Sequence, residues 1–141
     1  KDHGFMPIVL EAKTEEDYAQ WVADQKAGAA ATAAEAGKTW NKEDLMAKGE
    51  SVYDAYCASC HQANGQGIPG VFPGIAGSPV ATGDIAKHID IGVNGVAGTA
   101  MQAFGEQLGD ADLAAVITYQ RNAFGNNTGD LIQPSDIKAA R

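Results

Sequence analysis

Cys57-Ala58-Ser59-Cys60-His61 is the stretch that decides how this chain is organised. Two thiols three positions apart, followed directly by a histidine, form the covalent attachment signature of a c-type haem. At this spacing both sulfurs can add to the two vinyl groups of one porphyrin, and the imidazole of His61 then lies beneath the iron. The motif predicts one covalent haem c with His61 as its proximal ligand.

Three other chemistries use a Cys-x-x-Cys pair: a thioredoxin-type dithiol, half of a zinc site and a structural disulfide. A dithiol reductase places the pair at a helix start within a βαβ pattern, which the Gly/Ala-rich surroundings lack. A cysteine-rich zinc site needs further ligands, and the chain has only two cysteines. We therefore favour haem attachment over these alternatives.

The second axial position has two candidate donors, Met101 and His88. Met101 lies in the glycine-rich stretch 94–101, and a thioether on such a loop can reach the distal face of the haem. Its alternative role is core filling, which is common for methionine. His88 falls beside Ile85 and Ile89, and we interpret it as a histidine at the solvent edge of a helix. Met101 is therefore the expected sixth ligand.

Charge and hydropathy exclude several classes of partner. The net charge is -8, and both parts are acidic: residues 1–41 hold four Lys against seven Asp/Glu, and 42–141 hold six Lys/Arg against eleven. Nucleic acid and anionic membranes are therefore not expected partners. No apolar run approaches the roughly 20 residues that span a bilayer. Because haem c is attached outside the cytoplasm, we expect a periplasmic location or the outer face of the cytoplasmic membrane, any export signal or anchor being removed or omitted.

Two long helical patterns accompany the motif. The first begins at an Asn41 cap and runs to Tyr56. The second covers 110–124, and Gly125-Asn126 closes it. The apolar face of the first helix comprises Leu45, Gly49, Val52, Tyr53 and Tyr56. A mid-helix glycine costs about 1 kcal/mol relative to alanine unless close packing offsets it, so we expect the two helices to cross at Gly49. A short terminal helix is expected from residue 135.

Residues 42–125 resemble a class I cytochrome c. That family has an all-α fold in which an N-terminal and a C-terminal helix cross through a glycine and an aromatic residue, as Gly49, Tyr53 and Tyr119 stand here. It also places a proline after the haem motif whose carbonyl accepts from the proximal histidine, a role that Pro73 matches. Ile75 then resembles the apolar residue that packs on the haem. The resemblance implies cofactor contacts from Cys57, Cys60, His61, Met101, Pro73 and Ile75, with His61 and Met101 as iron ligands.

The first residues carry a second resemblance. The stretch 3–12 is similar to the end of the cupredoxin domain in subunit II of haem–copper cytochrome oxidases, where a His-x-x-Met pair supplies the last ligands of a dinuclear copper centre. A short helix over 14–22 follows, with Thr14 and Asp17 as its capping pair. The bridging cysteines of that centre are missing, so His3 and Met6 are not expected to bind copper. The start within a motif suggests a cut fragment.

Together these features predict three parts and an electron-transfer function. Residues 1–25 are the remnant of the copper domain, 26–41 an Ala/Gly-rich linker that is either flexible or helical, and 42–141 the cytochrome domain. The domain is not an enzyme by itself. It takes electrons from a soluble cytochrome or a quinol-oxidising complex and relays them to the oxidase copper domain. The alternatives are a free-standing soluble periplasmic cytochrome c and an enzyme or sensor with an open haem site, which requires that Met101 does not ligate.

Overall fold

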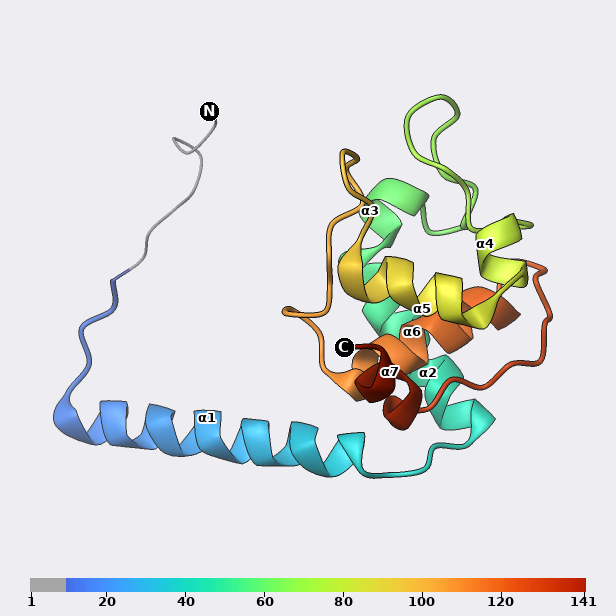
Figure 1. Ribbon diagram of the computed structural model, residues 1–141. Helices are drawn as coiled ribbons and strands as arrows, with labels where there is room; N and C mark the ends of the chain where they lie inside the picture. The colour runs from blue at the N-terminus through green and yellow to red at the C-terminus, as the bar shows by residue number, and fades with distance from the viewer. Residues whose placement is uncertain (1–9) are drawn as a thin grey trace. The chain divides into compact units, whose positions relative to one another are not determined.

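A computed structural model describes residues 10–141, and all the regular elements in that range are helices (Figure 1). The described residues divide into two compact units, 10–31 and 32–141. The all-helical content confirms the expected fold class. The candidate copper ligands His3 and Met6 lie outside the described residues. The helices are α1 (Glu15–Ala36), α2 (Lys42–Tyr56), α3 (Ala58–His61), α4 (Pro79–Thr82), α5 (Ile85–Asn94), α6 (Asp110–Asn122) and α7 (Pro134–Ala140).

Helix α1 is much longer than the helix expected over 14–22. Its start is as expected, since Thr14 Oγ1 accepts from Asp17 N at 3.1 Å and its hydroxyl donates to the Asp17 carboxylate at 2.8 Å. The helix continues to Ala36 because the following residues are mostly alanine, the strongest helix former. The expected linker is therefore helical from residue 26 to 36. None of the helices in residues 10–141 is long and apolar enough to cross a membrane.

The last turn of α1 belongs to the second unit and is held there through Trp40. The Trp40 indole N–H donates to the carbonyl oxygen of Glu35, and the Gln133 side chain bonds both the backbone N–H and the carbonyl of Trp40. Lys48 pairs with the carboxylates of Glu35 and Asp112 at 3.1 and 2.8 Å. These contacts hold residues 35–40 against α2, α6 and the start of α7.

Helix α2 crosses α6 at Gly49, as expected. A Cβ built on Gly49 would overlap the backbone carbonyl oxygen of Ala115 and would lie 2.6 Å from Tyr119 Cβ. Asn41 caps the helix by accepting from Asp44 N at 2.8 Å. Four residues of the expected apolar face are buried, whereas Tyr56 is 45% exposed. Only glycine leaves room for the close approach of these two helices.

Helix α6 ends at Asn122, two residues before the expected end. Phe124 has a φ of 59°, and its ring lies against Gly65 and 5.0 Å, centroid to centroid, from the ring of Tyr53. The chain leaves the helix at Ala123, whose backbone is extended. The expected terminal helix is present as α7, where Gln133 and Asp136 form a capping box.

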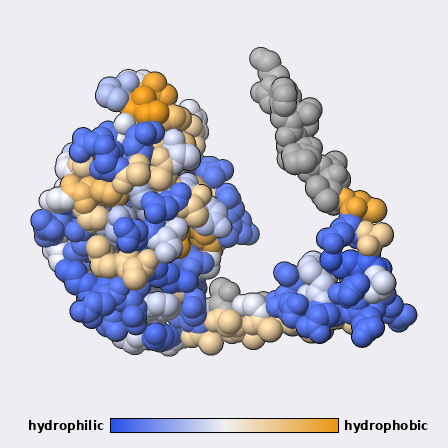
Figure 2. All heavy atoms as spheres, turned by 180° about the vertical axis from the view of Figure 1, so that it is seen from behind, coloured by the Kyte–Doolittle hydropathy of each residue, from blue (hydrophilic) through white to orange (hydrophobic). Residues whose placement is uncertain are grey.

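The buried residues of the second unit come mainly from α2, α5, α6 and α7. By contrast, the face of this unit that Figure 2 shows is mostly hydrophilic, with some hydrophobic residues among the polar ones. The core consists of Val52, Tyr53, Ile89, Val93, Phe104, Leu108, Leu113, Ala114, Val116, Ile117, Ile132 and Ile137. Part of this core lines a large cavity.

Candidate haem site

A cavity of about 500 Å³ opens among α3, α4, α5, α6 and the loop after α5. This volume lies within the roughly 300–1,000 Å³ of small-molecule and cofactor pockets. Cys57, Cys60, His61 and Met101 all line it, although 40 residues separate His61 from Met101. Apolar side chains form most of the remaining wall, including Val80, Ile91, Leu113, Val116 and Ile117. The fold therefore collects the predicted haem-binding residues at one hollow.

Cys57 lies where α2 meets α3, and Cys60 lies one turn further on, within α3. Cys57 ends α2 by donating its N–H to Tyr53 O at 2.8 Å, and its own carbonyl accepts from His61 N at 2.9 Å. Both thiols are free and half-buried. Burial, with a smaller contribution from Cys60, raises the pKa of Cys57 to about 11. Before haem attachment, the Cys57 thiol is therefore protonated at neutral pH.

The orientation of His61 is set by the backbone of Pro73. His61 Nδ1 lies 2.8 Å from Pro73 O, the contact expected from the resemblance. A carbonyl oxygen can only accept, so Nδ1–H donates and Nε2 keeps its lone pair. Gly67 holds the intervening loop: its N–H donates to His61 O at 2.8 Å, and a Cβ there would meet Pro73 C at 2.6 Å. The imidazole is thus held with Nε2 available as a metal ligand.

Met101 lies on a tight loop after α5. Val96 N–H donates to Met101 O at 2.9 Å, and Met101 N–H donates to Thr99 Oγ1 at 3.1 Å. Gly95 has a φ of 70°, and a Cβ there would lie 2.6 Å from Met101 O, so the loop requires glycine at this position. Met101 is half-buried and packs on the hydrophobic core, as does Ile75.

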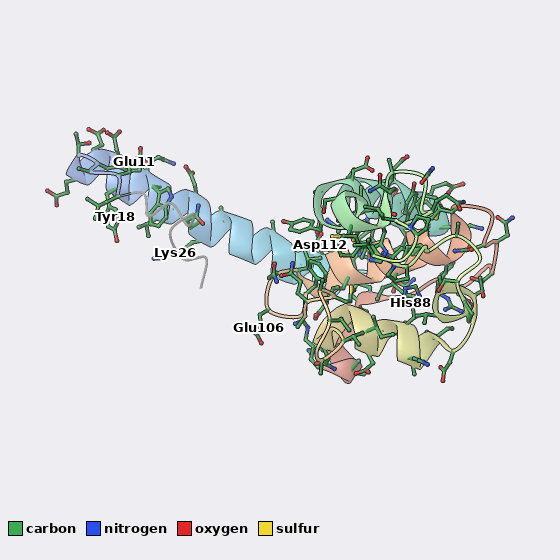
Figure 3. The ribbon with its side chains drawn as sticks, turned by 90° about the horizontal axis from the view of Figure 1, so that it is seen from above. Glu11, Tyr18, Lys26, His88, Glu106 and Asp112 are labelled. Atoms are coloured by element: carbon green, nitrogen blue, oxygen red, sulfur yellow. The ribbon has the colours of Figure 1, made fainter. Side chains whose placement is uncertain are left out.

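His88 is not at the solvent edge, and that interpretation was wrong. Its side chain is 4% exposed, and Nε2 lies 2.9 Å from the Gln120 Oε1 atom of α6. Burial, together with the nearby charge of Arg121, lowers the pKa of His88 to about 4 despite the bond to Gln120. The turn of α5 that carries His88 packs inward on α6. His88 and Gln120 both line the cavity, and Figure 3 shows His88 between the α5 and α6 ribbons.

The chain matches the model of a known protein family over residues 44–119. The description of that family is cytochrome c oxidase, cbb3-type, subunit III. The matched segment contains the cysteine pair, His61 and Met101. The chain belongs to this cytochrome c family. The domain therefore carries a covalent haem c and acts in electron transfer.

Individual relatives of this cytochrome c domain come from several kinds of protein. It is 32% identical over 111 residues to the cytochrome c subunit of a quinone alcohol dehydrogenase from Gluconobacter oxydans, covering 72% of this chain and 23% of the relative. It is 33% identical over 94 residues to cytochrome c-552 of Thermus thermophilus, covering 57% and 71%. It is 36% identical over 84 residues to the cbb3-type cytochrome c oxidase subunit CcoP of Azospirillum brasilense, covering 55% and 28%.

These relatives differ in length. The chain spans 23% and 25% of the first two curated relatives, both cytochrome c subunits of dehydrogenases. The similarity therefore concerns one domain of those proteins. In cytochrome c-552, by contrast, it covers most of the relative.

The residues present fit a haem c on geometric grounds. Two free thiols lie on one helical turn, an imidazole oriented by Pro73 O lies beside them, and the walls are apolar. Sequence reasoning missed Gln120, and it missed Tyr56 and Phe104, whose rings line the cavity and meet edge to face at 6.5 Å. Gln120 directly follows Tyr119, the aromatic residue of the expected helix crossing. A glutamine on an otherwise apolar helix face was the sequence signal that could have identified it.

Proposed function

We propose that this domain holds a six-coordinate haem c between His61 and Met101 and exchanges single electrons without binding a substrate at the iron. The observation that carries the proposal is the shared cavity: the cysteine pair, the oriented His61 and the Met101 loop all line it. When bound, the haem supplies a reversible ferric/ferrous couple. The chain's own residues hold the macrocycle, keep both axial donors in place and limit the access of water.

Each residue group has a distinct part in this proposal. Cys57 and Cys60 form the two thioether bonds. Pro73 O keeps the proton of His61 on Nδ1, so that Nε2 would be available to hold the iron. The Met101 thioether favours ferrous iron, and the apolar wall, to which Ile75 contributes, disfavours the extra charge of the ferric state. Both effects raise the reduction potential.

Replacement of the proposed sixth ligand tests this function. In Met101→Ala the sixth position should open to water or added ligands, and the potential should fall. The near-infrared methionine-to-iron band of the ferric protein should disappear in this variant. Met46→Ala is the matched control, because Met46 is a half-buried methionine on α2 that does not line the cavity. A Met101→Ala protein that keeps the near-infrared band would assign the sixth position to another residue.

For the parent protein we propose a cytochrome c oxidase subunit II, in which residues 1–25 end the copper domain, 26–41 connect it and 42–141 form the cytochrome domain. The support is the stretch 3–12, with its His-x-x-Met pair and apolar strand pattern. The electron would enter this haem from a soluble cytochrome or a quinol-oxidising complex and leave to the copper centre, on the periplasmic side of the membrane. A tethered donor reaches a high effective concentration without tight docking.

A free-standing periplasmic cytochrome c is the second candidate. The similarity to cytochrome c-552, which extends over 71% of that relative, favours it. The residues encoded directly upstream of Lys1 distinguish the two. A Cys-x-x-x-Cys pattern there identifies the oxidase parent, and a secretion signal in its place identifies the free-standing protein.

A further inference from the structure

Two polar side chains interrupt the apolar wall of the cavity where α5 packs on α6. His88 and Gln120 are 4% and 8% exposed, and their side chains meet at 2.9 Å. Their neighbours on the wall include Gly92, Val116 and Ile117. A buried polar pair costs free energy unless all of its groups find partners, so its presence in this wall needs an explanation.

The bond between the two side chains has a defined direction. The Oε1 atom of Gln120 can only accept, so Nε2–H of His88 donates to it. His88 is neutral near pH 7, because its burial and the charge of Arg121 oppose protonation. Nδ1 of His88 is enclosed by protein atoms and has no partner among the described residues, so a second proton there would have no acceptor. His88 therefore fixes the orientation of the Gln120 amide.

The amide nitrogen of Gln120 is left with two N–H groups to donate. Among residues 10–141 no group accepts from it. In the part of the chain that the structure describes, two unpaired side-chain nitrogens are completely enclosed by protein, His88 Nδ1 and Arg121 Nη1. The amide nitrogen of Gln120 is not one of them, so it is accessible. Because Gln120 lines the cavity and is otherwise buried, this donor opens onto the cavity.

The chemistry of the expected occupant supplies one kind of acceptor. The edge of a haem is hydrocarbon except for its two propionate carboxylates, which are strong acceptors. We propose that Gln120 donates a hydrogen bond to a haem propionate and that His88 positions it for this bond. Arg121 does not take this role, because it does not line the cavity. Its Nε and Nη2 are bound to Asp130 and to the carbonyl of Gly83, and its Nη1 is enclosed by protein atoms. This inference rests on the proposed haem site.

The bond has a consequence for the redox couple. A donor on the propionate draws part of its negative charge away from the iron, and that charge otherwise stabilises the ferric state. Loss of the donor should shift the ferric-to-ferrous ratio at a given electrode potential toward ferric by up to about tenfold, which is about 59 mV for one electron.

Redox-difference infrared spectroscopy of the haem-loaded protein, with ¹³C-labelled haem carboxylates, tests the bond directly. In Gln120→Leu a labelled carboxylate band should move and the potential should fall. In His88→Leu the same band should move less, because Gln120 keeps its donor but loses its fixed orientation. Gln107→Leu is the control, since the exposed Gln107 amide is bound to Ala103 O and does not line the cavity. It should change neither quantity.

The outcomes separate this inference from the proposed function. If the band and the potential are unchanged in both variants while the haem stays covalently bound, the propionate contact is overturned and the haem site stands. A wild-type chain that carries no covalent haem overturns both. If Gln120→Leu does not fold because His88 loses its acceptor, His88→Leu/Gln120→Leu replaces the pair with apolar groups, and the same band shift is expected there.

Discussion

The two histidines in the cavity wall have opposite roles because their hydrogen-bond partners differ. His61 donates from Nδ1 to a backbone carbonyl at the rim and keeps Nε2 as a lone pair beside the cysteines. His88 donates from Nε2 to Gln120, and its Nδ1 is enclosed by protein. The Nε2 atom of His61 is therefore available for the proposed haem iron, whereas His88 is kept neutral and supports Gln120.

At the residue scale, His88 should make stability depend on pH. Its pKa is about 4 in the folded chain against an ordinary value of 6.5, so the unfolded state binds the proton first as pH falls. The contribution of neutral His88 to the free energy of unfolding is complete above pH 6.5. As pH falls from 6.5 to 4, this contribution is lost, and the free energy of unfolding decreases by about 3 kcal/mol. Denaturant unfolding of the holoprotein at several pH values should show this slope.

In His88→Leu the free energy of unfolding should depend less on pH between 6.5 and 4 than in the wild type. Arg121 is permanently charged, and it lowers the pKa of its partner Asp130 by hydrogen bonding, so Asp130 loses its contribution only below the ordinary carboxylate range. An Asp130→Asn control should therefore keep the slope between pH 6.5 and 4. An equal slope in wild type and His88→Leu would show that His88 is not buried as a neutral group.

At the scale of elements, the α2–α6 crossing positions the haem motif. Gly49 lies against Ala115 and Tyr119, and α2 ends at Cys57 two turns later. The ring of Tyr53 continues this contact, lying 5.7 Å from the ring of Tyr119, and its hydroxyl donates to Gln62 O at 2.7 Å. The crossing therefore determines where the motif turn lies relative to the cavity wall on α6.

Gly49→Val should destabilise the protein without removing the haem. The added side chain has no space beside the Ala115 carbonyl, and overpacking of this kind costs about 3 kcal/mol, near the upper end of the usual range. Chemical denaturation should show a lower midpoint, while the ferrous absorption bands stay unchanged because His61 and Met101 lie elsewhere. Ala47→Val on the exposed face of α2 is the control, and its midpoint should change little. An unchanged Gly49→Val midpoint would contradict the crossing.

At the scale of the whole molecule, the metal content follows from the two cysteines. Both lie on one turn at the cavity, and no cysteine is left to bridge a copper pair. We expect elemental analysis of the purified chain to give one iron and no stoichiometric copper per molecule, since His3 and Met6 lack bridging thiolates. A Cys57→Ala/Cys60→Ala sample, which cannot attach haem covalently, provides the control for iron. One or two tightly bound coppers per chain would contradict the prediction.

The amino-acid sequence by itself determined the features whose partners are close along the chain. The haem motif and the Asn41 and Thr14 caps follow from local spacing or backbone geometry. The length of α1 is also a local property, because its many alanines favour helix. The sequence alone had left open whether the linker over 26–41 is flexible or helical.

Only the tertiary structure decided the features whose partners are distant. His88 and Gln120 are 32 residues apart, and no helical pattern shows that the two meet inside the wall. Phe124 leaves the helical path because Gly65 makes room for its ring, a contact between residues 59 positions apart. Burial sets the charge state of His88 and the direction of the Gln120 amide, and burial depends on which helices pack together.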